Sequence, residues 1–466
     1  MLFSSLEFLY LFLPLTLFAY FALPYGAKNY VLLVASLLFY GIAQPRFLPL
    51  MLAVAIFDYF FGLFIFRATQ KGSKRAADVL CGVAVMCNVA VLFVFKYLDA
   101  ILVSFGAYAI GIELPAGISF YTFQAMSYVI DIRRRAARVQ KDPLLFITYV
   151  ALFPQLVAGP IVRYCEIDRE LTERTHNVSQ IAEGLRLFCV GLAKKTLLAN
   201  GAGEGWERMA RYSTEGGTTV GAWLGIFFFA FQIYFDFSGY SDMARGLGKV
   251  FGFEFPENFR YPYISRSITE FWRRWHITLS AWFREYVYIP LGGNRRGKWR
   301  MYVNLFVTWL LTGAWHGAAV NFLYWGLYFF AMLAIEKAFL LKLLERAPRV
   351  ISHFYAIFFI LVGWLIFASD DASVGIGTIE YLGQMVGIGC PLVNNDALFE
   401  LKRGLPFVII MAVGATPFPA YAFSRLDRKD SIVGRVAGNI LALASLMLCT
   451  VYLVDSGYNP FLYFKF

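Results

Sequence analysis

Two of the four histidines of this chain, His276 and His316, lie 40 residues apart in a largely apolar polypeptide. An imidazole surrounded by hydrocarbon loses hydration that apolar neighbours do not replace, so a histidine inside a membrane is a candidate functional residue. Its unperturbed pKa lies near neutrality. Such a side chain can therefore take a proton from an incoming hydroxyl or thiol while an acyl group is transferred.

His316 is expected to lie within the membrane. The apolar run 302–315 starts beside a basic loop and reaches His316 after 14 residues, which is about 20 Å of helix at ~1.5 Å per residue. Gly313 and Gly317 flank this residue. Their small size lets either a substrate or a neighbouring helix approach closely, and the sequence leaves both alternatives open.

His276 belongs to a segment, 258–300, in which aromatic and basic residues alternate. Phe271, Trp275, Thr278 and Trp282 share one helical stripe, which predicts an amphipathic helix at the cytoplasmic interface. Membrane anchoring alone is the alternative. His276 would bind a phosphate-rich cofactor, order the active site or only form a local hydrogen bond.

Other polar residues are assigned smaller roles. Asp236 and Asp242 follow a long aromatic run, where an unpaired charge is costly, so an Arg or a backbone donor is the expected partner. His176 and His353 are interpreted as loop or interfacial residues. The six cysteines form no CxxC pair, so neither a metal site nor a disulfide framework is indicated.

The elements that must position these residues are membrane helices. With 59% hydrophobic and only 16% charged residues, the chain predicts an all-α, polytopic membrane protein. The first run, 8–23, lacks a basic leader and a cleavage site, so we expect a retained helix. The basic residues behind the net charge of +11 cluster in short loops between apolar runs. The positive-inside rule places such loops in the cytoplasm, so we interpret the charge as a signal for membrane orientation and not for nucleic-acid binding.

The loop order predicts eleven or twelve spanning helices in one membrane domain, residues 1–466. The run 144–161 should enter the membrane and return, because Pro154, Gly159 and Pro160 interrupt its helix. The basic loop 425–435 is expected on the cytoplasmic side. No internal repeat of fixed period is visible.

In the segments that hold His276 and His316, and in several others, the chain resembles the membrane-bound O-acyltransferase (MBOAT) family, in particular its bacterial alginate O-acetylation branch. The resemblance runs through LPAGISFYTFQAMSYVIDIRR, LFPQLVAGPIVRY, FDFSGYSDMARGLGKVFGFEFPENFRYPYISRSITEFWRRWHITLSAWFREYVYIPLGGNRRG, LLTGAWHGAAVNFLYWGLYFF and NPFLYFKF. These segments span nearly the whole chain.

The resemblance implies that His316 matches the catalytic histidine of the family and His276 its second motif position. It implies cytoplasmic acetyl-CoA as the donor, with no permanently bound cofactor, and O-acetylation of an exported polysaccharide through a periplasmic acetyltransferase partner. The protein would lie in the bacterial inner membrane. The residues nearest the donor's phosphates and pantetheine would be Arg273, Arg274, Arg284, Trp272 and Trp275.

Two alternatives remain open at this point. One is D-alanyl transfer to teichoic acid within the same family. The other is a polysaccharide-precursor transporter or flippase, although transporters commonly carry paired, repeated halves that this sequence lacks.

Overall fold

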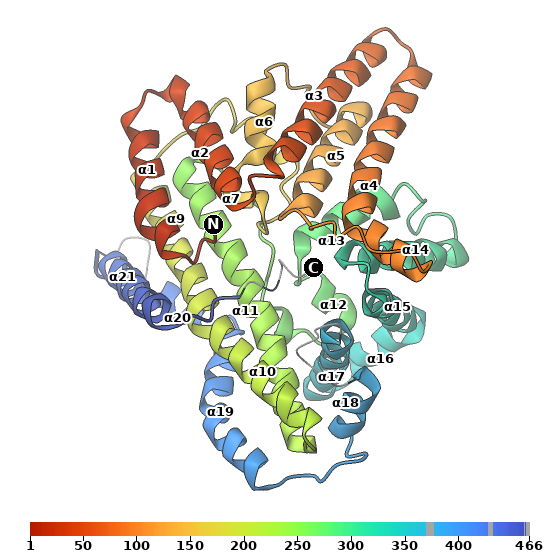
Figure 1. The fold of residues 1–466 in the computed structure, drawn as a ribbon, viewed down its shortest axis with the longest axis vertical. Helices are drawn as coiled ribbons and strands as arrows, with labels where there is room; N and C mark the ends of the chain where they lie inside the picture. Colours follow the sequence, from red (N-terminus) through yellow and green to blue (C-terminus); the bar gives the residue numbers. More distant parts are fainter. Residues whose placement is uncertain (370–376, 427–431, 461, 463–466) are drawn as a thin grey trace. The chain divides into compact units, whose positions relative to one another are not determined.

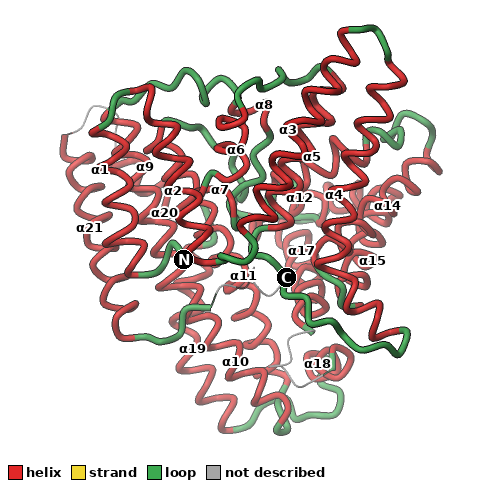
Figure 2. The backbone as a smooth tube through the Cα atoms, turned by 45° about the horizontal axis from the view of Figure 1, so that its top comes forward, coloured by secondary structure: helices red, strands yellow, loops and turns green. Residues whose placement is uncertain are grey.

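The computed structural model describes residues 1–369, 377–426, 432–460 and 462. Within these residues the chain forms helices and loops and no strand (Figure 2), as the all-α prediction requires. The helices of the first half are α1 (Leu13–Ala22), α2 (Lys28–Ala43), α3 (Leu48–Gln70), α4 (Lys74–Ser104), α5 (Ile118–Arg134), α6 (Pro143–Ala151), α7 (Phe153–Leu156), α8 (Tyr164–Ile167), α9 (Val178–Ala193) and α10 (Asn200–Thr214). Those of the second half are α11 (Thr219–Phe251), α12 (Ile268–Trp272), α13 (Ile277–Phe283), α14 (Lys298–His316), α15 (Val320–Ile335), α16 (Leu341–Arg346), α17 (Arg349–Ala368), α18 (Thr378–Met385), α19 (Asn395–Gly414), α20 (Phe418–Leu426) and α21 (Ile432–Asp455).

Six helices in the described part of the chain are long and apolar enough to cross a membrane. Their bounds are Tyr25–Ala43, Leu48–Gln70, Lys74–Ser104, Thr219–Phe251, Arg349–Ala368 and Gly434–Asp455. The protein is therefore a multi-pass membrane protein. The count of eleven or twelve spanning helices stays a prediction, and so does the single domain over 1–466.

Two local expectations from the sequence are confirmed. The first apolar run is helical, with a π-helical turn at Phe8–Phe12 that continues into α1. The run 144–161 is interrupted: α6 ends at Ala151, α7 ends at Leu156, and no helix follows until α8. Residues 427–431 of the predicted basic loop 425–435, and residues 461 and 463–466 of the motif at 459–466, lie outside the described residues.

The chain divides into two compact units built from interleaved segments. One unit comprises residues 1–192, 240–257 and 453–455, and the other comprises 193–239, 258–452 and 456–466. In the first unit α3 packs against α4 and α5 (Figure 1). Asn88 on α4 donates hydrogen bonds of 3.0 Å to both carboxylate oxygens of Asp58 on α3, which satisfies a buried carboxyl group.

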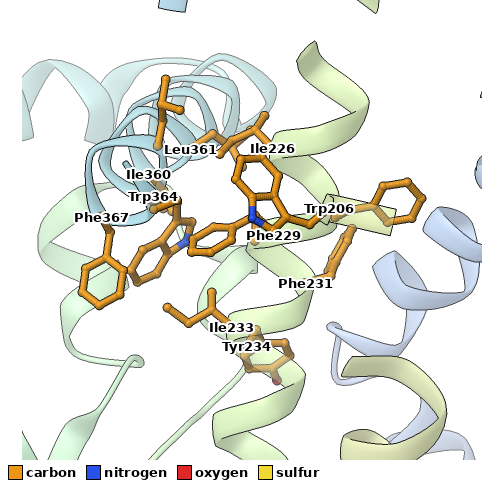
Figure 3. Close-up of a cluster of buried hydrophobic side chains, with 14 of the residues drawn as sticks. Trp206, Ile226, Phe229, Phe231, Ile233, Tyr234, Ile360, Leu361, Trp364 and Phe367 are labelled. Carbon is orange, nitrogen blue, oxygen red and sulfur yellow. The ribbon is translucent and has the colours of Figure 1, made fainter. Parts of the chain in front are cut away.

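The second unit, which holds both candidate histidines, has an aromatic core. Trp206 of α10, Phe229 of α11 and Trp364 of α17 are buried there (Figure 3). Large rings bury much apolar area with few rotatable bonds, so they fix the positions of the helices that carry them. This core holds α11 and α17 together beside the site described below.

Helices α14 and α15 form a hairpin whose backbones touch (Figure 1). A Cβ atom added at Gly313 would lie 2.4 Å from the carbonyl oxygen of Phe322, and one added at Gly326 would lie 2.5 Å from that of Trp309. Of the two alternatives that the small residues left open, a neighbouring helix is therefore the one found at Gly313. The close approach fixes the end of α14, where His316 lies.

The segment 258–300 differs from the single amphipathic helix that its stripe predicts. It contains two short helices, α12 and α13, and a π-helical turn at Arg284–Tyr288. The break falls at His276, which has a left-handed backbone with φ of 43°. Phe271, Trp275 and Trp282 are buried in the protein, so they pack within it instead of lining one exposed helix face.

We predict that Gly313→Ala lowers the thermal stability of the purified protein. The new methyl group meets backbone atoms that no side-chain rotation can move, and overpacking of this kind costs about 1–3 kcal/mol. Gly82→Ala on α4 is the matched control, because a Cβ there meets nothing within 4 Å. A fluorescence-monitored thermal melt in detergent measures both variants, and equal melting temperatures would contradict the close approach.

Candidate active site

His276, which precedes α13, and His316, which ends α14, line one cavity. Its volume is about 20 Å³, only slightly above the roughly 10–15 Å³ that one water molecule needs. Most of its walls are aromatic or aliphatic. The lining residues are Ile233, Asp236, Phe237, Trp275, His276, His316, Trp325, Trp364, Phe367 and Leu462.

His316 is the last residue of α14 and is buried. Its ring lies 5.0 Å from that of Trp325 and 5.2 Å from that of Phe367, both nearly perpendicular to it. These contacts fix the plane of the imidazole by packing on two sides. Gly317, which follows, has an extended backbone, so the chain leaves the helix directly after the histidine.

His276 precedes α13 and is also buried. Its Nδ1 atom lies 3.0 Å from Oδ1 of Asn258, and the ring of Phe237 packs edge to face at 4.7 Å. Removal from water lowers the pKa of His276 to about 3, because burial disfavours the charged imidazolium. The ring is therefore neutral over the physiological pH range.

The backbone around His276 is held from two sides. Asn258 accepts a hydrogen bond of 2.9 Å from Ile277 N through its carbonyl oxygen, and its side chain reaches Thr278. Left-handed backbone costs an ordinary residue about 1–2 kcal/mol, and such strain persists where surrounding contacts determine it. Here the contacts with Asn258 hold the strained residue in the cavity wall.

Helix α12 is fixed by a buried carboxylate. Glu336, in the π-helical turn after α15, accepts hydrogen bonds of 2.6 Å from Ile268 N and 2.8 Å from Thr269 N. A carboxylate at a helix start satisfies N–H groups that have no partner within the helix. The contact ties α12 to α15 and seats Trp272 4.9 Å from the ring of Phe329.

One residue of the cavity lining, Asp236, belongs to a buried ion pair. Lys195 Nζ lies 2.8 Å from Oδ1 of Asp236, and both side chains are almost fully buried. The other carboxylate oxygen accepts a hydrogen bond of 2.9 Å from Leu462 N. Lys195 also donates to Asn200 Oδ1 at 2.9 Å and to the carbonyl oxygen of Pro460. This network holds Leu462 in the cavity wall.

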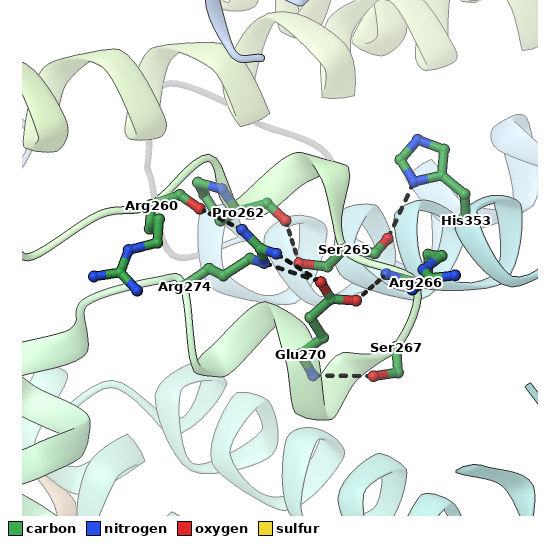
Figure 4. Close-up of polar contacts among 8 residues, drawn as sticks. All are labelled: Arg260, Pro262, Ser265, Arg266, Ser267, Glu270, Arg274 and His353. Carbon is green, nitrogen blue, oxygen red and sulfur yellow. Dashed lines mark hydrogen bonds and ion pairs between the residues drawn. The ribbon is translucent and has the colours of Figure 1, made fainter. Parts of the chain in front are cut away.

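A second, larger recess lies around basic residues of segment 258–300, and Figure 4 shows polar contacts among some of these residues. Its volume is about 510 Å³. Its lining residues are Arg260, Arg266, Ser267, Thr269, Glu270, Arg273, Arg274, Leu341, Leu344 and Glu345. Arg274 is engaged within the protein, because it donates to Glu270 at 3.0 Å and to the carbonyl oxygen of Arg260 at 3.1 Å.

The structure brings together some of the candidate residues but not all. His276, His316 and Trp275 line the small cavity, whereas Arg273 and Arg274 line the larger recess. Trp272 is part of the aromatic core beside Trp309 and Phe329. Arg284 is exposed and lies in neither lining.

The remaining polar candidates have partners within the protein. The expected partner of Asp236 was an Arg or a backbone donor, and the structure gives a backbone donor together with a lysine. Asp242 lies 3.6 Å from Arg245. His353 lies on α17 with Nδ1 3.1 Å from the carbonyl oxygen of Ser265, and His176 contacts the Tyr20 hydroxyl at 2.9 Å.

Sequence reasoning did not single out Asn258, Lys195 or the cavity-lining Phe367 and Trp325. Asn258 lies 18 residues before His276, too far for any helical spacing to connect them. Lys195 lies in an apolar run, and a charged residue there is a signal for a buried partner. That signal could have been paired with Asp236.

Comparison with known proteins gives a consistent result. The family model described as membrane-bound O-acyltransferase matches residues 84–367. A probable alginate O-acetylase of Azotobacter vinelandii is 37% identical over 503 aligned residues that cover 100% of both chains. Its counterpart from Pseudomonas aeruginosa is 43% identical over 80% of this chain and 73% of its own. A peptidoglycan O-acetyltransferase of Helicobacter pylori is 33% identical over 86% of this chain and 84% of its own.

We predict that Asp236→Asn destabilises the protein strongly. The substitution leaves the Lys195 ammonium buried without its counterion, which costs about 3–5 kcal/mol. The double variant Lys195→Met, Asp236→Leu should regain much of this loss because no buried charge remains. Glu173→Gln is the control, since its pair with Arg169 is 3.9 Å long and exposed. Thermal melts compare the four proteins, and an unshifted Asp236→Asn melt would exclude a stabilising ion pair.

Proposed function

The chain belongs to the membrane-bound O-acyltransferase family, and we propose that this multi-pass acyltransferase moves acetyl groups from cytoplasmic acetyl-CoA across the bacterial inner membrane to O-acetylate an exported polysaccharide. The observation that carries the proposal is the cavity that His276 and His316 line together. Alginate or a similar polymer is the proposed final acceptor, since two relatives named for alginate align with the whole chain.

The proposed reaction is an acyl transfer from sulfur to oxygen. A hydroxyl oxygen of the acceptor attacks the thioester carbon, the C–O bond forms and the C–S bond breaks. His316 takes the hydroxyl proton and returns it to the departing thiolate, so the products are an acetyl ester and CoA with a free thiol. A positioned general base of this kind contributes about 10²–10⁴-fold to the rate.

The size of the cavity supports a short acyl group. Its volume of about 20 Å³ is close to that of one water-sized group, which suits the methyl end of an acetyl group. Trp325 and Phe367 form walls against His316, and well-packed aromatic walls resist expansion for a longer chain.

The larger recess supports a phosphate-bearing donor. Arg260, Arg266 and Arg273 join Arg274 in its lining, and arginine binds phosphate through paired, charge-assisted hydrogen bonds. Because Arg274 is engaged by Glu270, we assign phosphate binding first to Arg273. The basic loops around it are the ones that the positive-inside rule places in the cytoplasm.

The immediate acceptor on the outer side is proposed to be a periplasmic or membrane-anchored acetyltransferase, which would pass the acetyl group to the polysaccharide, the final acceptor. In that route the attacking hydroxyl belongs to the partner protein. Direct transfer to a sugar hydroxyl is the alternative, and the same cavity and base would serve it.

We predict that His316→Ala abolishes acetyl transfer, with a loss of at least about 100-fold. Inner-membrane vesicles that hold the protein, its partner and the polymer receive acetyl-CoA labelled in the acetyl group, and label in the polymer is counted. His353→Ala is the control, because His353 lies outside the cavity and bonds a backbone carbonyl.

Three outcomes would contradict the proposal. If a His316→Ala protein folds, reaches the membrane and supports full acetylation, His316 is not the general base. Polymer that stays unlabelled with acetyl-CoA but gains label from a carrier protein charged with labelled D-alanine indicates D-alanyl transfer. Polymer that crosses the membrane with no bound label indicates a transporter.

We predict that Arg273→Gln raises KM for acetyl-CoA roughly tenfold with little change in kcat, as expected for one lost charge-assisted hydrogen bond to a phosphate. With acetyl-pantetheine, which lacks the nucleotide phosphates, the variant and the parent should have equal KM. Arg211→Gln is the control, since Arg211 is exposed in the last turn of α10 and outside the recess. A KM for acetyl-CoA unchanged by Arg273→Gln would remove this residue from the donor site.

A further inference from the structure

The side chain of Asn258 meets both His276 and the start of α13. Its Oδ1 atom lies 3.0 Å from His276 Nδ1, 2.9 Å from Thr278 Oγ1 and 3.3 Å from Thr278 N. Asn258 is itself buried, with 1% of its surface exposed. Because this side chain is shielded from bulk solvent, the cluster favours the arrangement in which donors face acceptors.

The backbone of Thr278 decides which end of the Asn258 amide faces the cluster. A backbone N–H can only donate, and the Asn258 NH₂ group can only donate as well. Turning the amide over would place two donors against each other at this position, at a cost of about 1–3 kcal/mol for the unmade hydrogen bond. The oxygen of Asn258 therefore faces Thr278 N and, with it, His276 Nδ1.

We infer that Asn258 is a positioning residue that holds His276 as the neutral tautomer with its proton on Nδ1. An amide oxygen accepts and does not donate, so the nitrogen that faces it must carry the hydrogen. A neutral imidazole has one N–H, and Nε2 is then left with a lone pair. The ring can accept a hydrogen bond at Nε2 but cannot donate one there.

The inference rests on the proposed function for its meaning in catalysis. Of the two roles open to a second histidine, hydrogen-bond donor to the acyl oxygen or acceptor for an O–H or N–H group of a bound substrate, this tautomer permits only the second. His276 would orient that group in the cavity while His316 acts as the base. Burial, which keeps the ring uncharged, supports the same assignment.

Few ionisable groups are close enough to alter the state of His276. Among the described residues that line its cavity, the ionisable ones are Asp236 of α11, which is paired with Lys195, and His316 of α14. Segment 258–259 contributes the uncharged Asn258 and Phe259. A carboxylate at position 258 would therefore be the nearest unpaired anion.

We predict that Asn258→Asp shifts the acidic limb in the pH profile of acetyl transfer to higher pH. A carboxylate against Nδ1 favours the imidazolium and raises the pKa of His276. The protonated ring has no lone pair at Nε2, so activity falls as pH decreases and returns as pH increases. We expect the midpoint of this limb to lie at least one pH unit above that of the parent protein. Asn258→Leu should lower kcat/KM roughly 10- to 100-fold, the usual effect of removing a group that orients a functional histidine.

Two further variants separate positioning from general structural damage. Asn304→Asp places a carboxylate at another buried asparagine, on α14 and outside the cavity, and should leave the acidic limb unchanged. Thr278→Val removes one donor to Oδ1 but keeps the backbone N–H that fixes the amide, so the tautomer should persist.

The tautomer itself is read by NMR on protein with ¹⁵N-labelled histidine, without any turnover. A ring N–H signal assigned to Nδ1 of His276 in the parent, and a mixture of tautomers in Asn258→Leu, is the expected result. A proton on Nε2 in the parent, or an Asn258→Asp pH profile that matches the parent, would overturn the inference. If the protein transferred no acetyl group at all, the NMR result would still stand, so failure of the proposed function and failure of this inference are distinguishable.

Discussion

The second unit depends on one constraint: a polar group that is buried away from water needs a polar partner inside the protein. His276 faces Asn258, Glu336 caps α12, and Asp236 faces Lys195. These contacts join residues that are 18 to 68 positions apart in the sequence. The polar groups therefore determine which segments meet, and the aromatic rings fill the space around them.

Much of the architecture follows from the sequence because membrane helices carry a strong local signal. The apolar runs, the interrupted helix around Pro154 and Gly159, and the helix that ends at His316 are all encoded within stretches of about 20 residues. His316 lies at the end of α14, where the length of the apolar run after the basic loop places it, and its depth in the membrane stays a prediction. The family resemblance reached the same residue through its motif.

The rest of the site could not be predicted, because it depends on contacts between distant segments. The stripe of Phe271, Trp275, Thr278 and Trp282 suggested one helix, yet His276 interrupts it with a left-handed residue. Helical spacing gives no warning of such a break, since the contacts that stabilise it come from Asn258. Similarly, Phe367 reaches His316 from another helix altogether, and only the packing of α17 reveals this.

The ion pair between Lys195 and Asp236 has a consequence for biosynthesis. Its network includes the carbonyl oxygen of Pro460, which is 265 residues beyond Lys195, and the amide of Leu462. While the chain is being translated, Lys195 and Asp236 are made well before those residues. Leu462 belongs to the cavity lining, so a nascent chain lacks the finished cavity wall until residue 462 has been synthesised.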